Sequence, residues 1–432
     1  MKGTFRSLSV RNFRLFASGQ VVSVAGTWMM VVAQDWVVLA LTGDSGAALG
    51  TVTSLQFAPL LLLTLYGGRL ADRYNKRRLL IGTNLASGVL ALALALLVLT
   101  GEVRLGHVYL FALGLGAVNA VEVPTRMSFV SELVGAELLP NASALSAAYF
   151  NTARVVGPAL AGLLIAQAGI GQVMLLNAAS YLATVVALRR MRPDELHRGA
   201  PQGAPARVVD GLRYVTSRPD VLAPLALVAV VGVFGMNFQL TLPLLAKTVF
   251  RSDVTSFGLL TTALAAGSLL GAFATTARRG RPSSATVAGS ALAFGLLETV
   301  TGWAPTYPAA AVLLALTGFA TVCFAQAANQ RVQLGSDPAY RGRVMALYTL
   351  IFQGVTPLGA LLVGGLSEHL GARSGLYVGG LASVAVALVA MAVDASAIPG
   401  RPTERRGRLC ARLRKGDESM TCQPVPAARA PQ

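Results

Sequence analysis

Several ionisable side chains lie inside long apolar runs of this sequence, namely Asp35, Glu122, Arg126, Arg154, Glu298 and Arg331. In a membrane-spanning helix such a residue costs about 2.5–3.5 kcal/mol on insertion scales, so it tends to face a cavity or a partner. The chemistry open to an isolated carboxyl group in that setting is the uptake and release of protons. The three acids are therefore the candidate proton carriers.

Asp35 is the first of these candidates. It lies in the stretch AQDWVV, about seven residues (roughly 10 Å of helix) before the polar break Thr42-Gly43-Asp44. No basic residue lies within a helical turn of it, and burial without a counter-ion favours the neutral form of a carboxyl group. Asp35 could then take a proton outside and release it inside, and it could also attract a cationic drug when the proton leaves. The alternative is a structural acid that only holds helices together. Glu298, close to the outer end of its run, ranks second.

Glu122 and Arg126 are four residues apart, which places them on one face of a helix. They are either a structural ion pair or part of a gate, and Glu122 is the third candidate for proton coupling. Arg154 has two interpretations as well: it pairs with an acid across the bundle, or its long side chain extends to the interface.

The composition indicates which elements must position these groups. Of the 432 residues, 54% are hydrophobic and 13% are charged, whereas soluble proteins carry about a quarter charged residues. Apolar runs of roughly 20 residues predict a polytopic membrane protein, and its spans must be helical because lipid offers no partner to free backbone groups. The twelve predicted spans are about 14–41, 48–67, 79–100, 107–130, 142–167, 172–189, 221–246, 256–277, 285–303, 309–332, 343–367 and 374–394.

The formal net charge of +17 comes from basic residues between the apolar blocks, which is the pattern of membrane topology and not of nucleic-acid binding. With the N-terminus in the cytoplasm, about 29 of the 36 Lys and Arg residues fall on the cytoplasmic side. We expect a multi-pass protein of the cell membrane with both termini in the cytoplasm.

The spans divide six and six. We expect an N-terminal half over 1–189, a cytoplasmic linker over 190–219 with a short surface helix near 206–217, a C-terminal half over 220–394 and a disordered cytoplasmic tail over 395–432. Similar stretches begin spans five and eleven, and such repeats are typical of transporters that bind substrate between their halves. The polar residues expected to line that cavity are Gln34, Asn237, Gln239 and Asn329.

No catalytic or cofactor pattern accompanies these features. Three cysteines are too few and too scattered for a disulfide framework or a metal cluster. The three histidines belong to no nucleophile–base or metal constellation, which argues against an enzyme. There is no G-x-x-x-x-G-K-[ST] loop for ATP. We expect no cofactor and a proton gradient as the energy source.

The loop after the second span reads GRLADRYNKRR, from Gly68 to Arg78. It resembles the signature loop of the major facilitator superfamily, G-x-L-a-D-r-x-G-r-k, with Asn75 where the family has Gly. This resemblance implies a fold of two six-helix halves around a central cavity. It also implies that Asp72 docks at the start of span eleven, beside Arg341 and Arg343, and closes the cytoplasmic side. The gating residues expected on this basis are Gly68, Asp72, Arg73, Arg77 and Arg126, with Lys76 and Arg78 serving only as topology signals.

Further segments are similar to the macrolide-efflux and enterobactin-exporter branch of drug–proton antiporters, among them LSVRNFRLFASGQVVSVAGTWMM and GRVMALYTLIFQGVTPLGALL. Span five carries Gly157-Pro158-Ala159-Leu160-Ala161-Gly162, which resembles the antiporter motif of that branch, with Ala161 for its first paired Gly. The alternative is ordinary packing of small residues between helices.

The resemblance implies a monomeric transporter that exports amphipathic small molecules in exchange for protons. A proton-coupled importer or facilitator of a small metabolite and a non-transporting membrane sensor remain the alternatives.

Overall fold

The computed structural model describes residues 5–197, 208–276, 280–338 and 340–396. Parts of the predicted linker and almost all of the predicted tail (198–207 and 397–432) lie outside these described residues. Within them the chain is helical and contains no strand. The helices are α1 (Arg11–Thr42), α2 (Gly46–Arg73), α3 (Lys76–Leu99), α4 (Leu105–Ala168), α5 (Ile170–Arg189), α6 (Val208–Thr216), α7 (Pro219–Phe234), α8 (Phe238–Leu244), α9 (Val254–Thr276), α10 (Ser284–Gly302), α11 (Tyr307–Gly335), α12 (Arg341–Gly354), α13 (Thr356–Leu370) and α14 (Ser374–Ser396).

The predicted spans correspond closely to these helices. Eleven segments of the described chain are long and apolar enough to cross a membrane. One of them, α4, has 64 residues and is interrupted at Gly135, whose φ of 71° is not helical. At 1.5 Å per residue, α4 is about three times longer than one crossing requires. The count of twelve spans thus depends on α4 crossing twice and stays a prediction, while the predicted surface helix is present as α6.

Two other spans are broken near their middles. α7 ends at Phe234, and the chain resumes as α8 and a short π-helical segment, Leu245–Val249. The amide of Asn237 at this break donates to the carbonyl oxygens of Val233 and Phe234, at 2.7 and 3.3 Å. The second break separates α12 from α13 at Val355. Breaks of this kind are tolerated at membrane depth where protein groups satisfy the freed backbone atoms.

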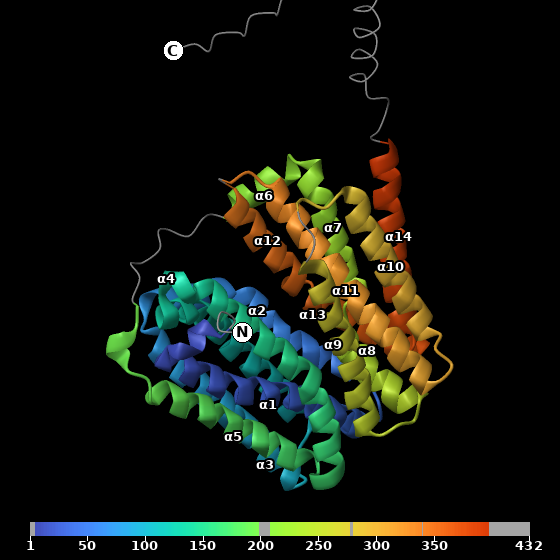
Figure 1. The fold of residues 1–432 in the computed structure, drawn as a ribbon. Helices are drawn as coiled ribbons and strands as arrows, with labels where there is room; N and C mark the ends of the chain where they lie inside the picture. Colours follow the sequence, from blue (N-terminus) through green and yellow to red (C-terminus); the bar gives the residue numbers. More distant parts are fainter. Residues whose placement is uncertain (1–4, 198–207, 277–279, 339, 397–432) are drawn as a thin grey trace, which may run out of the picture.

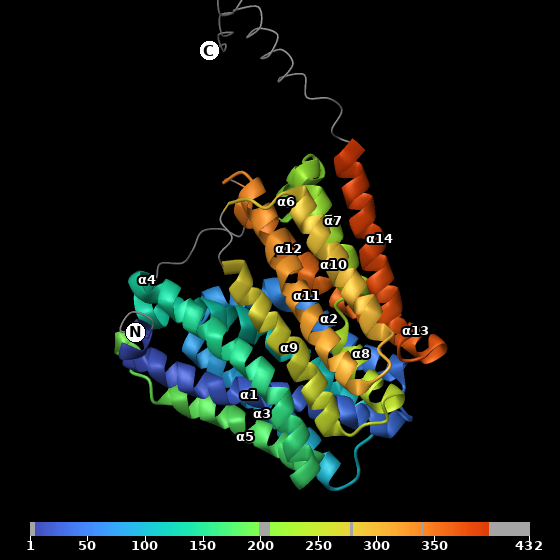
Figure 2. The same ribbon diagram turned by 45° about the vertical axis from the view of Figure 1, so that its right-hand side comes forward.

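The helices form two groups, α1–α5 and α7–α14. Figures 1 and 2 show the groups meeting beside α8 and α9 and diverging toward the end of the bundle at which α1 and α12 begin. We call this end the terminal face; α3, α7 and α10 also begin there. The opposite end, at which α2, α5, α9, α11 and α14 begin, is the far face. The predicted division at 1–189 and 220–394 stays a prediction, although the two groups follow it.

Close packing seals the far face. α2 packs against α13 and α4 packs against α9. A Cβ added at Gly258 of α9 would collide with the carbonyl oxygen of Pro158, and one added at Gly162 would lie 2.7 Å from Thr255 Cα. On the other pair, a Cβ at Gly50 would collide with the carbonyl oxygen of Ala360. Glycine at these positions lets helices of opposite groups touch backbone to backbone.

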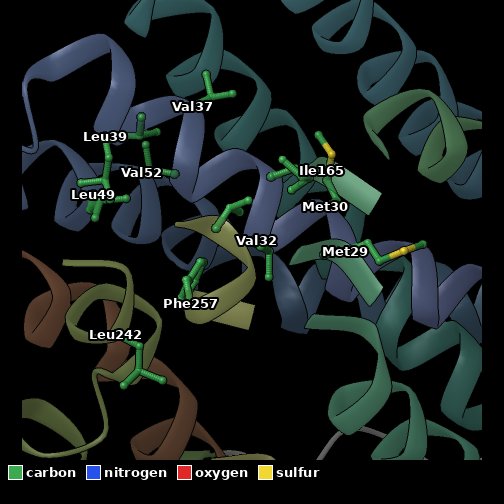
Figure 3. Packing of buried hydrophobic residues seen from close by; sticks show 14 of the residues in the cluster. Met29, Met30, Val32, Val37, Leu39, Leu49, Val52, Ile165, Leu242 and Phe257 are labelled. Carbon is green, nitrogen blue, oxygen red and sulfur yellow. The ribbon is translucent and has the colours of Figure 1, made fainter. Parts of the chain in front are cut away.

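A buried apolar cluster crosses the same boundary. It combines residues of α1 and α2 with Leu242 of α8 and Phe257 of α9, as Figure 3 shows. Beside it, the rings of Trp36 and Phe257 stack with centroids 6.2 Å apart. The far half of the bundle is therefore one continuous core.

The far-face seal predicts a conformational effect of substitution. Gly258→Leu should destabilise the closed far face because overpacking costs about 1–3 kcal/mol. We expect a cysteine at Val31, in a background without the native cysteines, to react at least fivefold faster with an impermeant maleimide supplied at the far face. Gly82→Leu is the matched control, because a Cβ at Gly82 meets open space. Equal labelling of both variants would contradict the proposed role of Gly258.

Candidate transport cavity

A cavity of about 380 Å³ lies between the two groups. Its lining residues come from the middle and the terminal half of their helices, so the cavity lies on the terminal side of the far-face seal. α1 contributes the largest share, and α8 and α12 supply Gln239 and Gln353 from the second group. The polar lining residues are Gln20, Ser23, Thr27, Gln56, Asn84, Ser87, Asn119, Glu122, Arg126, Tyr181, Gln239 and Gln353.

An apolar pocket of about 360 Å³ adjoins this cavity between α2 and α12. The two spaces share Leu60 and Gln353. The pocket is lined mainly by Leu60, Leu61, Ala346, Leu350 and the methyl-bearing Thr64 and Thr349. A polar cavity with an adjoining apolar pocket fits a molecule that has both polar and apolar parts.

Of the four residues expected to line the cavity, Gln239 does so. Gln34 and Asn237 are buried outside its wall, at 4% and 7% exposure, and Asn329 is half-buried on α11. Sequence reasoning did not select the amides Gln20, Gln56, Asn84, Asn119 and Gln353. Several of them could have been found in the sequence as uncharged amides inside apolar spans. An amide in such a position needs a hydrogen-bonding partner or a cavity.

Glu122 and Arg126 form the expected pair. Arg126 Nε donates to Glu122 Oε1 at 2.9 Å, and both side chains line the cavity. Their side chains are only 22% and 16% exposed, for Arg126 and Glu122 respectively. Each charge thus neutralises the other inside the wall, which makes Glu122 the weakest of the three candidates for a freely exchanging proton.

Asp35 and Glu298 differ from Glu122 because each has a buried carboxylate oxygen, Oδ2 and Oε2 respectively, for which the described residues supply no hydrogen-bond partner. Asp35 is 6% exposed and follows Val31, a lining residue, by one helical turn on α1. It therefore continues the cavity-facing side of α1 into the sealed half. Helix geometry gives this placement because residues four apart share a face.

Glu298 belongs to the second group and is 1% exposed. It lies against the break between α7 and α8: a Cβ added at Gly235 would be 2.9 Å from Glu298 Oε2, and one at Gly379 of α14 would be 2.9 Å from Oε1. Glu298 does not line the cavity. Its carboxyl group is therefore enclosed by glycines of neighbouring helices, apart from the cavity.

The signature loop joins α2 to α3 at the terminal face. Asp72 is exposed, and no ion pair or hydrogen bond of its carboxylate is found among the described residues. Arg341, at the start of α12, has a buried Nε that finds no partner within the part of the chain that the structure describes. The contact expected between Asp72 and this region is thus absent while the terminal face is open, and its role as a gate stays a prediction.

Other loop residues make contacts inside the first group. Arg77 donates to the carbonyl oxygens of Leu188 and Arg189 at 2.6 and 2.9 Å, which caps the end of α5. Arg73 lies over the ring of Tyr74. Lys76, expected to be only a topology signal, pairs with Glu132 at 2.6 Å.

At two positions where the family's signature loop has glycine, Asn75 and Gly68, this structure does not require a glycine. Asn75 has φ −63°, so no left-handed residue is needed there; its side chain instead caps α3 by accepting from the Arg78 N–H at 3.1 Å. A Cβ at Gly68 would meet open space, whereas one at Gly67 would collide with the carbonyl oxygen of Ala120. Gly67 is therefore the position that close packing requires.

The antiporter-like motif lies at the contact of α4 with α1 and α9. A Cβ at Gly157 would be 2.6 Å from Trp28 Cβ, and Thr255 Oγ1 donates to the Gly162 carbonyl oxygen at 3.2 Å. Pro158 opposes Gly258 as described above. The motif therefore joins the two groups at the seal, and its role in antiport stays a prediction.

Polar contacts add to the seal at the far face. Lys247 pairs with Asp44 at 2.5 Å, and its ammonium lies 5.5 Å from the centre of the Trp36 ring. Glu368 of α13 accepts from Ser45 Oγ at 2.9 Å and from the Ala47 N–H at 3.3 Å, at the N-terminus of α2. A carboxylate at a helix N-terminus is stabilised by the helix dipole. Both contacts join the two groups.

The fold agrees with the comparisons to known proteins. The sequence profile of the family described as transmembrane secretion effector, MFS_3, matches residues 2–405. The chain belongs to this family. Because its members are transporters of the major facilitator superfamily, the protein is a multi-pass membrane transport protein and not an enzyme.

Relatives of this chain include the multidrug efflux pump Tap of Mycolicibacterium fortuitum, which is 30% identical over 83% of this chain and 89% of that protein. The enterobactin exporter EntS of Escherichia coli O139:H28 is 26% identical over 83% and 86%. A solved bacterial homolog of the human lysosomal transporter Spinster superposes with a TM-score of 0.68 at 15% identity, covering 89% of this chain and 96% of that one. This last likeness concerns the fold.

Removing the Lys247–Asp44 pair tests the polar part of the seal. Lys247→Gln should raise far-face labelling of a cysteine at Val31 by about two- to fivefold, because a partly exposed ion pair contributes at most about 1 kcal/mol. Arg6→Gln is the control, since Arg6 pairs with Glu137 inside the first group. A double variant that also carries Asp44→Asn should add little to Lys247→Gln. Full additivity would mean that the two residues act separately.

Proposed function

We propose that this protein exports amphipathic small molecules across the cell membrane in exchange for protons, by alternating access. The observation that carries the proposal is the asymmetry of the bundle: a cavity built by both groups lies on one side of a seal made by both groups. A transporter that alternates needs such a site between two bodies that can rock against each other.

The direction of transport is argued from charge and from the relatives. Basic residues gather near the terminal face, at Arg11, Lys76, Arg77, Arg78 and Arg341, and loops rich in Lys and Arg stay in the cytoplasm. The cavity then faces the cytoplasm and is placed to receive a molecule for export. The names of the relatives, an efflux pump and an exporter, support the same direction.

The coupling step is assigned to Asp35. Its carboxyl group lies in the sealed half, one helical turn beyond the lining residue Val31, where opening of the far face would expose it. A carboxyl group in that position can receive a proton from the acidic outside and release it to the cytoplasm after the terminal face opens. Glu298 is the second candidate, because it is buried against the broken span of the other group and could tie a protonation to movement of α7.

Asp35→Asn tests this assignment. In proteoliposomes with an imposed pH gradient, acid on the far side, the substitution should lower gradient-driven export at least tenfold, because an amide cannot carry the proton. Glu298→Gln serves as the comparison and should retain a response to the gradient if Asp35 is the carrier.

Three results would contradict the proposal in different ways. Full, pH-dependent export by Asp35→Asn would remove Asp35 as the carrier and pass the role to Glu298 or Glu122. Export by the unmodified protein without any dependence on the pH gradient would refute antiport itself. Movement of substrate only inward with protons would favour the importer.

A further inference from the structure

The charges in and around the cavity limit what it can bind. Of the 19 residues that line it, only Glu122 and Arg126 are charged, and they are paired at 2.9 Å. The other polar groups are amides and hydroxyls. The wall therefore offers no free carboxylate to a molecule arriving from the terminal face.

A further positive charge lies directly behind this wall. Arg154 follows the lining residue Phe150 by one turn of α4, and its guanidinium lies 5.9 Å from the centre of the Trp28 ring. Trp28 lines the cavity too and meets Phe150 edge to face, with centroids 6.2 Å apart. Among the described residues, no carboxylate lies within ion-pair distance of Arg154. Its charge is balanced neither by an acid across the bundle nor by one on α4.

The remaining acid near the cavity is Asp35, which continues the same face of α1. If Asp35 carries a proton, Arg154 leaves the site with one net positive charge. If Asp35 is ionised, the two residues balance and the site is neutral overall. In neither state is the site negative, so a cation would lose its hydration without gaining a counter-charge.

We propose that the substrate is a weakly acidic amphiphile: an apolar body in the pocket between α2 and α12, and a carboxylate or comparable acidic oxygen group beside Trp28 and Arg154. This inference rests on the proposed function and narrows its substrate class. Arg is suited to this role because its planar fork of N–H donors matches a carboxylate and stacks on an aromatic face. The basic residues at the terminal face do not indicate an acidic substrate, since membrane topology accounts for them.

The substrate charge sets how export responds to the membrane potential. If an anion leaves while one proton enters, two charges move in the direction that an inside-negative potential favours. Each charge changes the attainable gradient by about 50-fold per 100 mV. Exchange of a singly charged cation for one proton moves no net charge and would not respond.

A matched series of probes tests the proposal. N-dansylglycine carries a carboxylate, its methylamide is uncharged, and a dansylamide with a trimethylammonium tail is a cation; all three share one fluorescent body. With the purified full-length protein, we expect the carboxylate probe to bind at least tenfold more tightly than the cation. In proteoliposomes, a potassium–valinomycin potential applied without a pH gradient should accelerate export of the carboxylate probe and leave the cation unaffected.

Variants separate a charge effect from loss of folding. Arg154→Gln should weaken binding of the carboxylate probe at least tenfold and change binding of the uncharged methylamide less than twofold. Arg154→Lys should recover part of the loss, because the positive charge returns. Arg190→Gln removes an exposed arginine at the end of α5 and should change neither probe.

The proposal is overturned if the cation binds as well as the carboxylate probe, or if Arg154→Gln weakens all three probes equally. If no probe is exported under any gradient, the proposed function fails, while the binding comparison still decides the charge of the preferred ligand. Tight, Arg154-dependent binding of the carboxylate probe together with its potential-driven export supports both.

Discussion

Backbone-to-backbone contact between opposite groups of helices is the constraint on which the rest of this structure depends. At Gly50, Gly162 and Gly258, a single added carbon would meet backbone atoms of a helix in the other group. In lipid, where helices gain no hydrophobic attraction for one another, such contacts supply the packing that holds two bodies together. Because they all lie in the far half, the groups separate in the terminal half and the cavity forms there.

The same arrangement decides where polar groups can be placed. Where the groups separate, amides and hydroxyls line the cavity, and the one charged pair on its wall neutralises itself. Where they are sealed, Asp35 remains enclosed with an unpaired oxygen, and Glu298 is enclosed in the second group in a similar way. A rocking motion that opened the far face would exchange these environments. Substrate binding and proton exchange would then share one structural change, as antiport requires.

The sequence predicted the helices well because membrane spans have a simple physical cause: an apolar run of the right length must be helical. The α7–α8 and α12–α13 breaks were not predicted. An apolar run does not show where its helix will be interrupted, because the freed backbone groups find hydrogen-bond partners only in the folded protein. Site residues were harder. Asp35 and the Glu122–Arg126 pair stood out because charge is rare in a span, but an amide such as Gln34 looks the same in sequence whether it faces a cavity or a neighbouring helix. Arg154 was recognised as unusual, yet its position over Trp28 depends on how α4 packs against α1, which no local pattern encodes.

We propose that the two faces open in alternation around one cavity. Distances between spin labels on opposite groups test this most directly, with one pair at the terminal face (Arg78 and Gly342) and one at the far face (Thr100 and Leu370), all exposed. Lowering the pH at the far side should lengthen the far-face distance and shorten the terminal-face distance in the same fraction of molecules. Simultaneous lengthening at both faces, or a fixed distance at both under every gradient, would contradict it.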